Sequence, residues 1–281
     1  MALDASSAGR RLAPVERSWD WRDTILYALG VGAGTESPQF TTQNSAGIAL
    51  QAVPTMAFVL GEANDEAVAT LAGVEDFSTT LHAEQRVEFF APVPTSGRIR
   101  TEKFVSAVFD KGRAAILEVT ADSFDSTTGE LLFRNVAVMY IPGAGGFGGD
   151  RGPSRPPAEP GNRPADETAT YRTRPDQALI YRLSGDYNPL HSDPARAAEL
   201  GYDRPILHGL CTLGFACRAL VSDRMTADPG LLRTLSARFV KPVLPGEELV
   251  VSMWRDQGAV RFDVATAEGS VVVDGGRATY A

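Results

Sequence analysis

Apolar residues in this chain occur in segments with either helical or alternating spacing, separated by clusters of glycine and proline. Residues 19–29 have helical spacing, and a run of glycines directly after them predicts the end of that helix. The apolar run 48–60 has Pro54 near its middle, and proline suits the first turn of a helix. We therefore predict a buried helix from Pro54 onward. Residues 1–18 are polar, and we expect their start to be poorly ordered.

Alternation of apolar and polar residues then predicts strands in the rest of the first half. These are residues 87–90, 99–109, 114–124 and 131–141. Asp110-Lys111-Gly112 is a hairpin turn signal between the second and third of them.

Residues 143–164 are rich in glycine and proline and poor in apolar residues, which predicts a linker. The stretch from Gly143 to Gly148 formally matches a dinucleotide-binding fingerprint. That fingerprint works because its last glycine opens a helix whose N-terminus holds the pyrophosphate. Further glycines and prolines follow here and exclude such a helix, so we expect no dinucleotide site.

The second half begins near Thr168. Asp193 is placed to cap a short helix that starts with Pro194 and ends at Gly201. Residues 209–221 are apolar nearly all round, which is typical of a buried helix. Strands are predicted at residues 235–240, 248–255, 259–266 and 270–280.

The two halves share one order of elements, which indicates a degenerate internal repeat. In each, a buried helix precedes a strand that ends in a proline-glycine corner, at residues 86–97 and 238–246, and three further strands follow. One long helix wrapped by a curved antiparallel sheet, present twice, is an α+β architecture in which the copies share a sheet. We predict a first repeat at 1–142, a linker at 143–167 and a second repeat at 168–281.

Composition narrows the functional classes. The chain has 281 residues, a net charge of -8 and a pI of about 5.0, so a general nucleic-acid role is not expected. No apolar run approaches the roughly 20 residues of a membrane helix, and the N-terminus shows no secretory signal. Cys211 and Cys217 are placed on different faces of one helix, which predicts free thiols. A reducing cytoplasm is the expected compartment.

Residues 181–209 carry the candidate chemistry. Asp186 and His191 bracket a turn whose Pro189 disfavours a helix. A carboxylate and an imidazole that share one water can remove a proton from it and deliver a proton elsewhere. Gly185 permits a close backbone approach. Gly209, after His208, offers a helix-terminal N–H to a developing oxyanion.

Simpler roles remain open for these residues. From spacing alone, Asp186 and His191 could cap turns, and His208 could merely begin the helix. His191, Asp193 and His208 have no compact metal-ligand spacing, so no metal is expected. A nucleophilic Ser184 would lack the strand–turn–helix elbow sequence. The simplest role for His82 is that of a surface or loop histidine.

The stretch from Tyr181 to His191, Tyr-Arg-Leu-Ser-Gly-Asp-Tyr-Asn-Pro-Leu-His, resembles the signature of the type 2, (R)-specific enoyl-CoA hydratases of the MaoC-like dehydratase family. The resemblance covers nearly the whole chain, including residues 27–34, 53–55, 82–85, 110–112 and 238–243. It implies a double hot-dog fold, homodimers and reversible hydration of a trans-2-enoyl-CoA to the (3R)-3-hydroxyacyl-CoA.

The resemblance also implies roles for particular residues. Asp186 and His191 would hold the catalytic water, Asn188 would help to position them, and the Gly209 N–H would polarise the thioester oxygen. We expect further acyl-CoA contacts, and these are His82, Lys111, Tyr187, Pro189, Leu190, His208 and Phe239. Ala83 stands where the family pattern leads us to expect glycine, which weakens a backbone contact there. No metal or redox cofactor is implied.

Three other functions fit the same fold. A hot-dog acyl-CoA thioesterase would release a free thiol. A carrier-protein-linked 3-hydroxyacyl dehydratase would run the same chemistry on a different handle. A non-catalytic acyl-binding subunit would lack the Asp/His pair, which this chain has.

Overall fold

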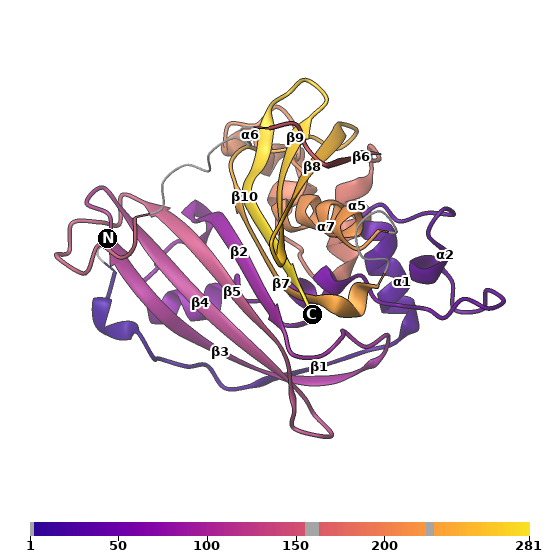
Figure 1. The fold of residues 1–281 in the computed structure, drawn as a ribbon. Coiled ribbons are helices and arrows are strands. Elements are labelled where there is room, and N and C mark those ends of the chain that lie inside the picture. Colours follow the sequence, from indigo (N-terminus) through magenta and orange to yellow (C-terminus); the bar gives the residue numbers. More distant parts are fainter. Residues whose placement is uncertain (1–2, 155–162, 223–227) are drawn as a thin grey trace.

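The computed structural model describes residues 3–154, 163–222 and 228–281. Ten strands form one antiparallel sheet in the order β1-β3-β4-β5-β2-β7-β10-β9-β8-β6 (Figure 1). Their bounds are β1 Val15–Trp19, β2 Leu81–Phe89, β3 Gly97–Asp110, β4 Ala114–Asp125, β5 Leu131–Pro142, β6 Glu167–Arg172, β7 Leu232–Phe239, β8 Glu248–Asp256, β9 Ala259–Thr266 and β10 Val271–Tyr280.

The strand order is symmetric about the β2–β7 pair, in which Val87 lies opposite Leu235. Moving outward on either side, β5 corresponds to β10, β4 to β9, β3 to β8 and β1 to β6. Each half of the chain therefore supplies the same five strands in the same sequence order. This confirms the α+β architecture and the repeat, with one continuous sheet formed by both copies.

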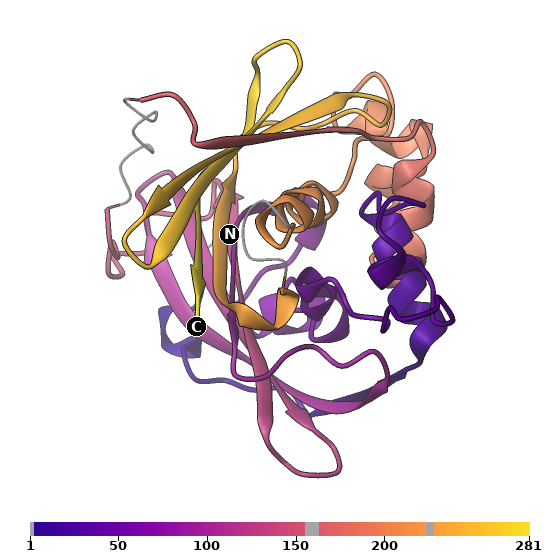
Figure 2. The ribbon, with the colours of Figure 1, turned by 45° about the vertical axis from the view of Figure 1, so that its right-hand side comes forward.

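The helices lie mostly in the segments that separate the first strand of each half from the second. They are α1 Trp21–Gly30, α2 Pro38–Thr41, α3 Ala57–Leu60, α4 Glu66–Leu71, α5 Gln177–Tyr181, α6 Pro194–Glu199 and α7 Gly209–Leu220. Every residue of α7 after Gly209 is buried. In Figure 2 the orange α7 lies inside the curve of the sheet, as its all-round apolar sequence predicts. The concave face of the sheet therefore covers that helix.

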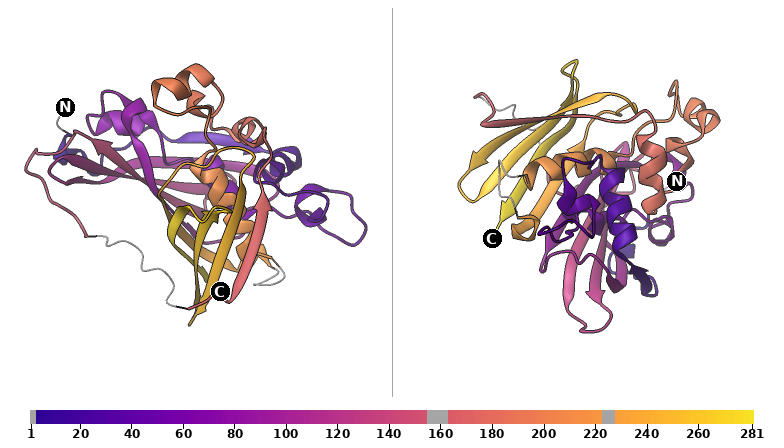
Figure 3. Two further views of the ribbon diagram at one scale, coloured as in Figure 1. Left: turned by 90° about the horizontal axis from the view of Figure 1, so that it is seen from above. Right: turned by 90° about the vertical axis from the view of Figure 1, so that its right-hand side faces the viewer.

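The main hydrophobic core is shared by the two halves. It contains Phe58 and Phe133 from the first half together with Phe215 and Leu235 from the second. The helices also meet across the halves, since α1 packs against α5, beside it in the right-hand view of Figure 3. This shared packing fixes the N-terminal segments relative to the residue 181–209 region.

Several predictions for the first half were wrong. The helix from Pro54 is only a 3-10 turn, Pro54–Met56, followed by the four-residue α3, so this half has no long central helix. Residues 3–18 are not simply a loose terminus, because Leu3 is buried and Val15–Trp19 forms edge strand β1. In the second half, the matching edge strand β6 was also missed. Both edge strands are short and carry polar residues, so their alternation is weak.

The glycine-rich part of the predicted linker is docked on the β3–β4 hairpin. The Asp110 carboxylate accepts hydrogen bonds from the backbone N–H groups of Gly112, Gly146 and Gly148, at 2.7–2.8 Å. These bonds lower the pKa of Asp110 to about 2. Two backbone N–H groups of the glycine-rich stretch that matches the dinucleotide-binding fingerprint therefore donate to Asp110 of the same chain. Residues 155–162 of the predicted linker lie outside the described residues. Across the described parts of the chain, no helix combines the length and apolarity needed to cross a bilayer.

Candidate active site

The segment that carries Asp186 is a tight bend between short helical turns. A 3-10 turn, Arg182–Ser184, follows α5 and ends at Gly185, whose φ of 138° is strained for any other residue. A second 3-10 turn, Pro189–His191, begins after Asn188, whose side-chain oxygen accepts a hydrogen bond from the Leu190 N–H at 3.0 Å. The Asn188 N–H in turn bonds the Asp186 carboxylate at 3.2 Å. Asn188 therefore shapes the bend between the two candidate catalytic residues.

The bend brings Asp186, His191 and His208 together. One carboxylate oxygen and one ring nitrogen of each histidine all lie within 4.8 Å of one another. This is the cluster that proton transfer through a shared water requires. The three groups lie closer together than their sequence spacing suggested. Three such groups at this distance would also suit a metal ion.

One backbone partner fixes the protons of His191. Its Nδ1 lies 2.9 Å from the Ile206 carbonyl oxygen. Since a carbonyl oxygen can only accept, Nδ1 carries the proton and Nε2 keeps its lone pair in the neutral ring. Burial lowers the pKa of His191, although the Asp186 carboxylate and the Ile206 carbonyl oppose this shift. His191 therefore presents a neutral base on its Nε2 side.

His208 supports the other two members of the cluster. Its ring stacks on that of His191, with centroids 3.7 Å apart, and its Nε2 donates to the Asp186 carbonyl oxygen at 3.3 Å. It is 1% exposed, and burial lowers its pKa well below the usual value. Its buried Nδ1 has no hydrogen-bond partner within the described structure. These contacts favour a positioning role rather than the direct substrate contact expected from the sequence.

Gly209 begins α7 next to this cluster, so its N–H has no acceptor within the helix. A Cβ at this position would lie 3.0 Å from the Phe239 ring. Phe239 in turn meets the edge of the His82 ring, with centroids 5.0 Å apart. The structure thus brings Gly209, Phe239 and His82 together across the β2–β7 junction. His82 lies in β2 rather than in a loop, and burial lowers its pKa to about 4.

The remaining candidates lie less centrally. Tyr187 is 59% exposed, with the Arg182 guanidinium 5.3 Å from its ring centroid. Pro189 is exposed and Leu190 half-buried on the same bend. Lys111 is on the β3–β4 turn, where its amine bonds the carbonyl oxygens of Arg151 and Pro153. The structure therefore gives Lys111 no contact with the Asp186 cluster.

Sequence reasoning missed Arg17, which joins the two halves at this bend. Its guanidinium donates to the Ser184 carbonyl oxygen at 2.7 Å and also to that of Val59. A Cβ at Gly185 would lie 3.2 Å from the guanidinium, so glycine leaves it room. An arginine in a polar N-terminal stretch carries no sequence signal of this role.

Sequence reasoning also missed Glu62, two residues after α3. Burial, with the Asp186 carboxylate as the next largest cause, raises the pKa of Glu62 to about 7. Besides Asp186, the candidate site therefore involves a second carboxyl group, that of Glu62, which comes from the first half of the chain. A single glutamate after an apolar run gives no warning of this, because the contact depends on the packing of the two halves.

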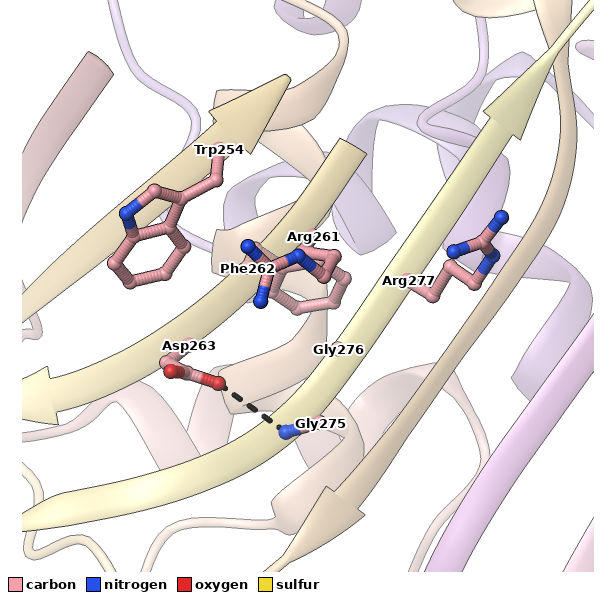
Figure 4. Close-up of a pocket in the computed structure, with 7 residues that line it drawn as sticks. All are labelled: Trp254, Arg261, Phe262, Asp263, Gly275, Gly276 and Arg277. Atoms are coloured by element: carbon pink, nitrogen blue, oxygen red, sulfur yellow. Dashed lines mark hydrogen bonds between the residues drawn. The ribbon is translucent and has the colours of Figure 1, made fainter. Parts of the chain in front are cut away.

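A separate hollow of about 230 Å³ lies on the C-terminal strands β8–β10 (Figure 4). Its residues are Trp254, Arg261, Phe262, Asp263, Gly275, Gly276 and Arg277. Asp263 accepts from the Gly275 N–H, and Arg261 bonds Asp256. None of these residues belongs to the Asp186 cluster, so we place the candidate chemistry at the cluster and not in this hollow.

Comparison with known proteins gives a consistent result. Residues 18–143 match the "MFE-2 hydratase 2 N-terminal domain" and residues 157–276 the "MaoC like domain". The chain is 41% identical to "3-hydroxyacyl-thioester dehydratase Y" of Mycobacterium tuberculosis, covering 100% of this chain and 99% of that protein. It is 37% identical to "Enoyl-CoA hydratase 2, peroxisomal" of Arabidopsis thaliana, covering 94% and 90%. The crystal structure of a MaoC-like dehydratase from Phytophthora capsici superposes with a TM-score of 0.88 at 29% identity, covering 99% and 98%.

Proposed function

Because this chain belongs to the MaoC-like dehydratase family, in the double hot-dog form with a hydratase 2 N-terminal domain, we propose that it is an (R)-specific enoyl-CoA hydratase. The reaction is the reversible addition of water to a trans-2-enoyl-CoA, giving the (3R)-3-hydroxyacyl-CoA. The observation that carries the proposal is the state of His191. Its Nδ1–H is held by the Ile206 carbonyl, and a ring nitrogen lies within 4.8 Å of the Asp186 carboxylate.

In this mechanism Asp186 and His191 hold one water between them. As the water oxygen bonds to C3 of the enoyl group, one of its protons passes to this pair. The electrons of the double bond move toward the thioester carbonyl, and the Gly209 N–H stabilises the negative charge that develops on its oxygen. A proton from the pair then reaches C2. Because one pair acts at both carbons from one side, syn addition is expected.

The surrounding residues have supporting roles in this proposal. Asn188 shapes the bend, and His208 orients the His191 ring and the Asp186 backbone. Phe239 adjoins Gly209, where the thioester would lie, and packs against His82, so both would form part of the acyl-CoA site. Tyr187, Pro189 and Leu190 form the outer wall of the bend. Lys111 remains a candidate for a CoA phosphate at the far end of the substrate, since lysine is a flexible point charge.

The test is a direct hydration assay with trans-2-enoyl-CoA esters of increasing chain length. Loss of the absorbance of the conjugated thioester reports hydration, and stereospecific dehydrogenases identify the product. We expect the (3R)-alcohol. Release of free thiol at the same rate as the absorbance loss would instead indicate a thioesterase. Activity on carrier-protein thioesters but not on CoA esters would identify a carrier-protein-linked dehydratase.

We also propose a homodimer in a reducing compartment such as the cytoplasm, with no metal or redox cofactor. Cys211 and Cys217 are both buried free thiols, which supports the reducing compartment. Light scattering on the purified protein tests the dimer. A mass of 30.0 kDa, that of one chain, would contradict it.

A further inference from the structure

The segment that leads to Glu62 is anchored by hydrogen bonds and close packing. The Asn135 side-chain amide donates to the carbonyl oxygens of Ala57 and Gly61, at 2.7 and 2.8 Å. Gly61 itself is packed so tightly that a Cβ would lie 2.2 Å from the Ser123 hydroxyl. The backbone just before Glu62 is therefore held against strand β5 by the side chain of Asn135.

Arg17 connects this segment to the bend that carries Asp186. Its guanidinium bonds the carbonyl oxygen of Val59, three residues before Glu62, and that of Ser184, two residues before Asp186. Two acidic side chains from opposite halves of the chain thus extend from segments that are bonded to the same cation. This arrangement accounts for the effect of the Asp186 charge on Glu62.

The four charged groups that act on Glu62 already sum to zero when Glu62 itself is neutral. They are the cations Lys103 and Arg17 and the carboxylates Asp186 and Asp65. Lys103 is already paired with Asp65 at 2.5 Å, and Arg17 is bonded to two carbonyl groups. An ionised Glu62 would add an unbalanced negative charge in a mostly buried place, which is unfavourable. Its neutral form is favoured for this reason.

We propose that Glu62 is a positioning residue of the site, whose neutral form leaves the Asp186 segment without a second negative charge close to it. This inference rests on the proposed hydratase function. Hydration places negative charge on the thioester oxygen in the transition state, and a second carboxylate nearby raises the energy of that state. Ionisation of Glu62 therefore slows the reaction, and Glu62 itself exchanges no proton with the substrate.

The size of the effect follows from the titration of this group. Burial and Asp186 raise the pKa of Glu62 to about 7, so the neutral fraction falls from about nine-tenths at pH 6 to about three-hundredths at pH 8.5. If only the neutral form permits turnover, kcat falls about thirtyfold over this interval. Removal of Lys103 raises the pKa of Glu62 further, because its charge opposes the shift.

The experiment is the kcat–pH profile of the full-length enzyme and of Glu62→Gln, whose side chain stays neutral, from pH 6 to 8.5. Glu66→Gln, an exposed acidic position on α4, is the matched control. We expect the alkaline decline in wild type and in the control, its absence in Glu62→Gln, and its displacement to higher pH in Lys103→Met. An unchanged decline in Glu62→Gln would overturn the proposal. So would a hundredfold loss at every pH in a folded Glu62→Gln, because Glu62 would then transfer protons itself.

Carbon NMR titration of labelled glutamate carboxyl groups tests the inference without activity. We expect the Glu62 signal to titrate near pH 7 in wild type and at lower pH in Asp186→Asn. Titration near the usual glutamate value of about 4.3 would overturn the inference even if hydratase activity is found. Wild type without hydration at any pH would instead refute the proposed function and leave the titration result standing.

Discussion

Acidification should destabilise this fold through its histidines, and His82 gives the effect a calculable size. Burial lowers the pKa of His82 from 6.5 to about 4 in the folded protein. The unfolded chain therefore binds more protons between these two values, and the free energy of unfolding falls as the pH drops from about 6.5 toward 4. Below pH 4 this contribution is fully lost and constant. From pH 7 to pH 5 it amounts to about 2 kcal/mol, an upper bound because His82 is only half-buried.

Urea unfolding at pH 7 and pH 5, followed by tryptophan fluorescence, measures this contribution in wild type and in His82→Gln. Glutamine has no titrating group, while His191 and His208 are present in both proteins and cancel in the comparison. Wild type should lose up to about 2 kcal/mol more than the variant over this pH interval. Equal losses in the two proteins would refute the assigned environment of His82.

Three further predictions concern the junction and the site. Replacing Arg17 with methionine removes two charge-assisted hydrogen bonds, each contributing about 1.5–3 kcal/mol, so the free energy of unfolding should fall by about 3 kcal/mol in chemical denaturation, and kcat should also fall. An unchanged unfolding midpoint would contradict the role of Arg17 at the bend. Gly209→Ala places a Cβ 3.0 Å from the Phe239 ring, and kcat/KM should fall at least about tenfold, whereas a value within twofold would show that the helix start does not adjoin the thioester. Dialysis against a chelator should leave hydration unchanged, because the mechanism needs the lone pair of His191 free; activity lost and then restored by added zinc would show a metal site instead.

The helices and the inner strands of the second half were predicted well because their signals are local. The twelve-residue α7 is apolar nearly all round, and Asp193 caps α6 through the Ala195 N–H as the Asp-Pro pair indicates. The order of the strands in the two halves also sufficed to predict a repeat. A pattern within ten to fifteen residues is enough for such elements.

The errors arose where tertiary contacts decide the outcome. The apolar run around Pro54 predicted a long helix, but only four α-helical residues fit between Pro54 and the tightly packed Gly61. Edge strand β1 pairs only with β3, so its sequence shows no two-sided burial. The pairing of Asp186 with His191 followed from the motif, whereas the place of His208 in the same cluster did not. Its neighbours Arg17 and Glu62 approach it from far along the chain, and no spacing could reveal them.

The most direct test of the account is the rate of enoyl-CoA hydration in Asp186→Asn and His191→Ala, compared with Asp193→Asn, which changes a capping carboxylate on the next helix. The first two variants should keep the wild-type circular dichroism spectrum and lose about two to four orders of magnitude in kcat, the usual contribution of acid–base groups. The third should hydrate at nearly the wild-type rate. Rates within tenfold of wild type in both Asp186→Asn and His191→Ala would contradict the assignment of the catalytic pair.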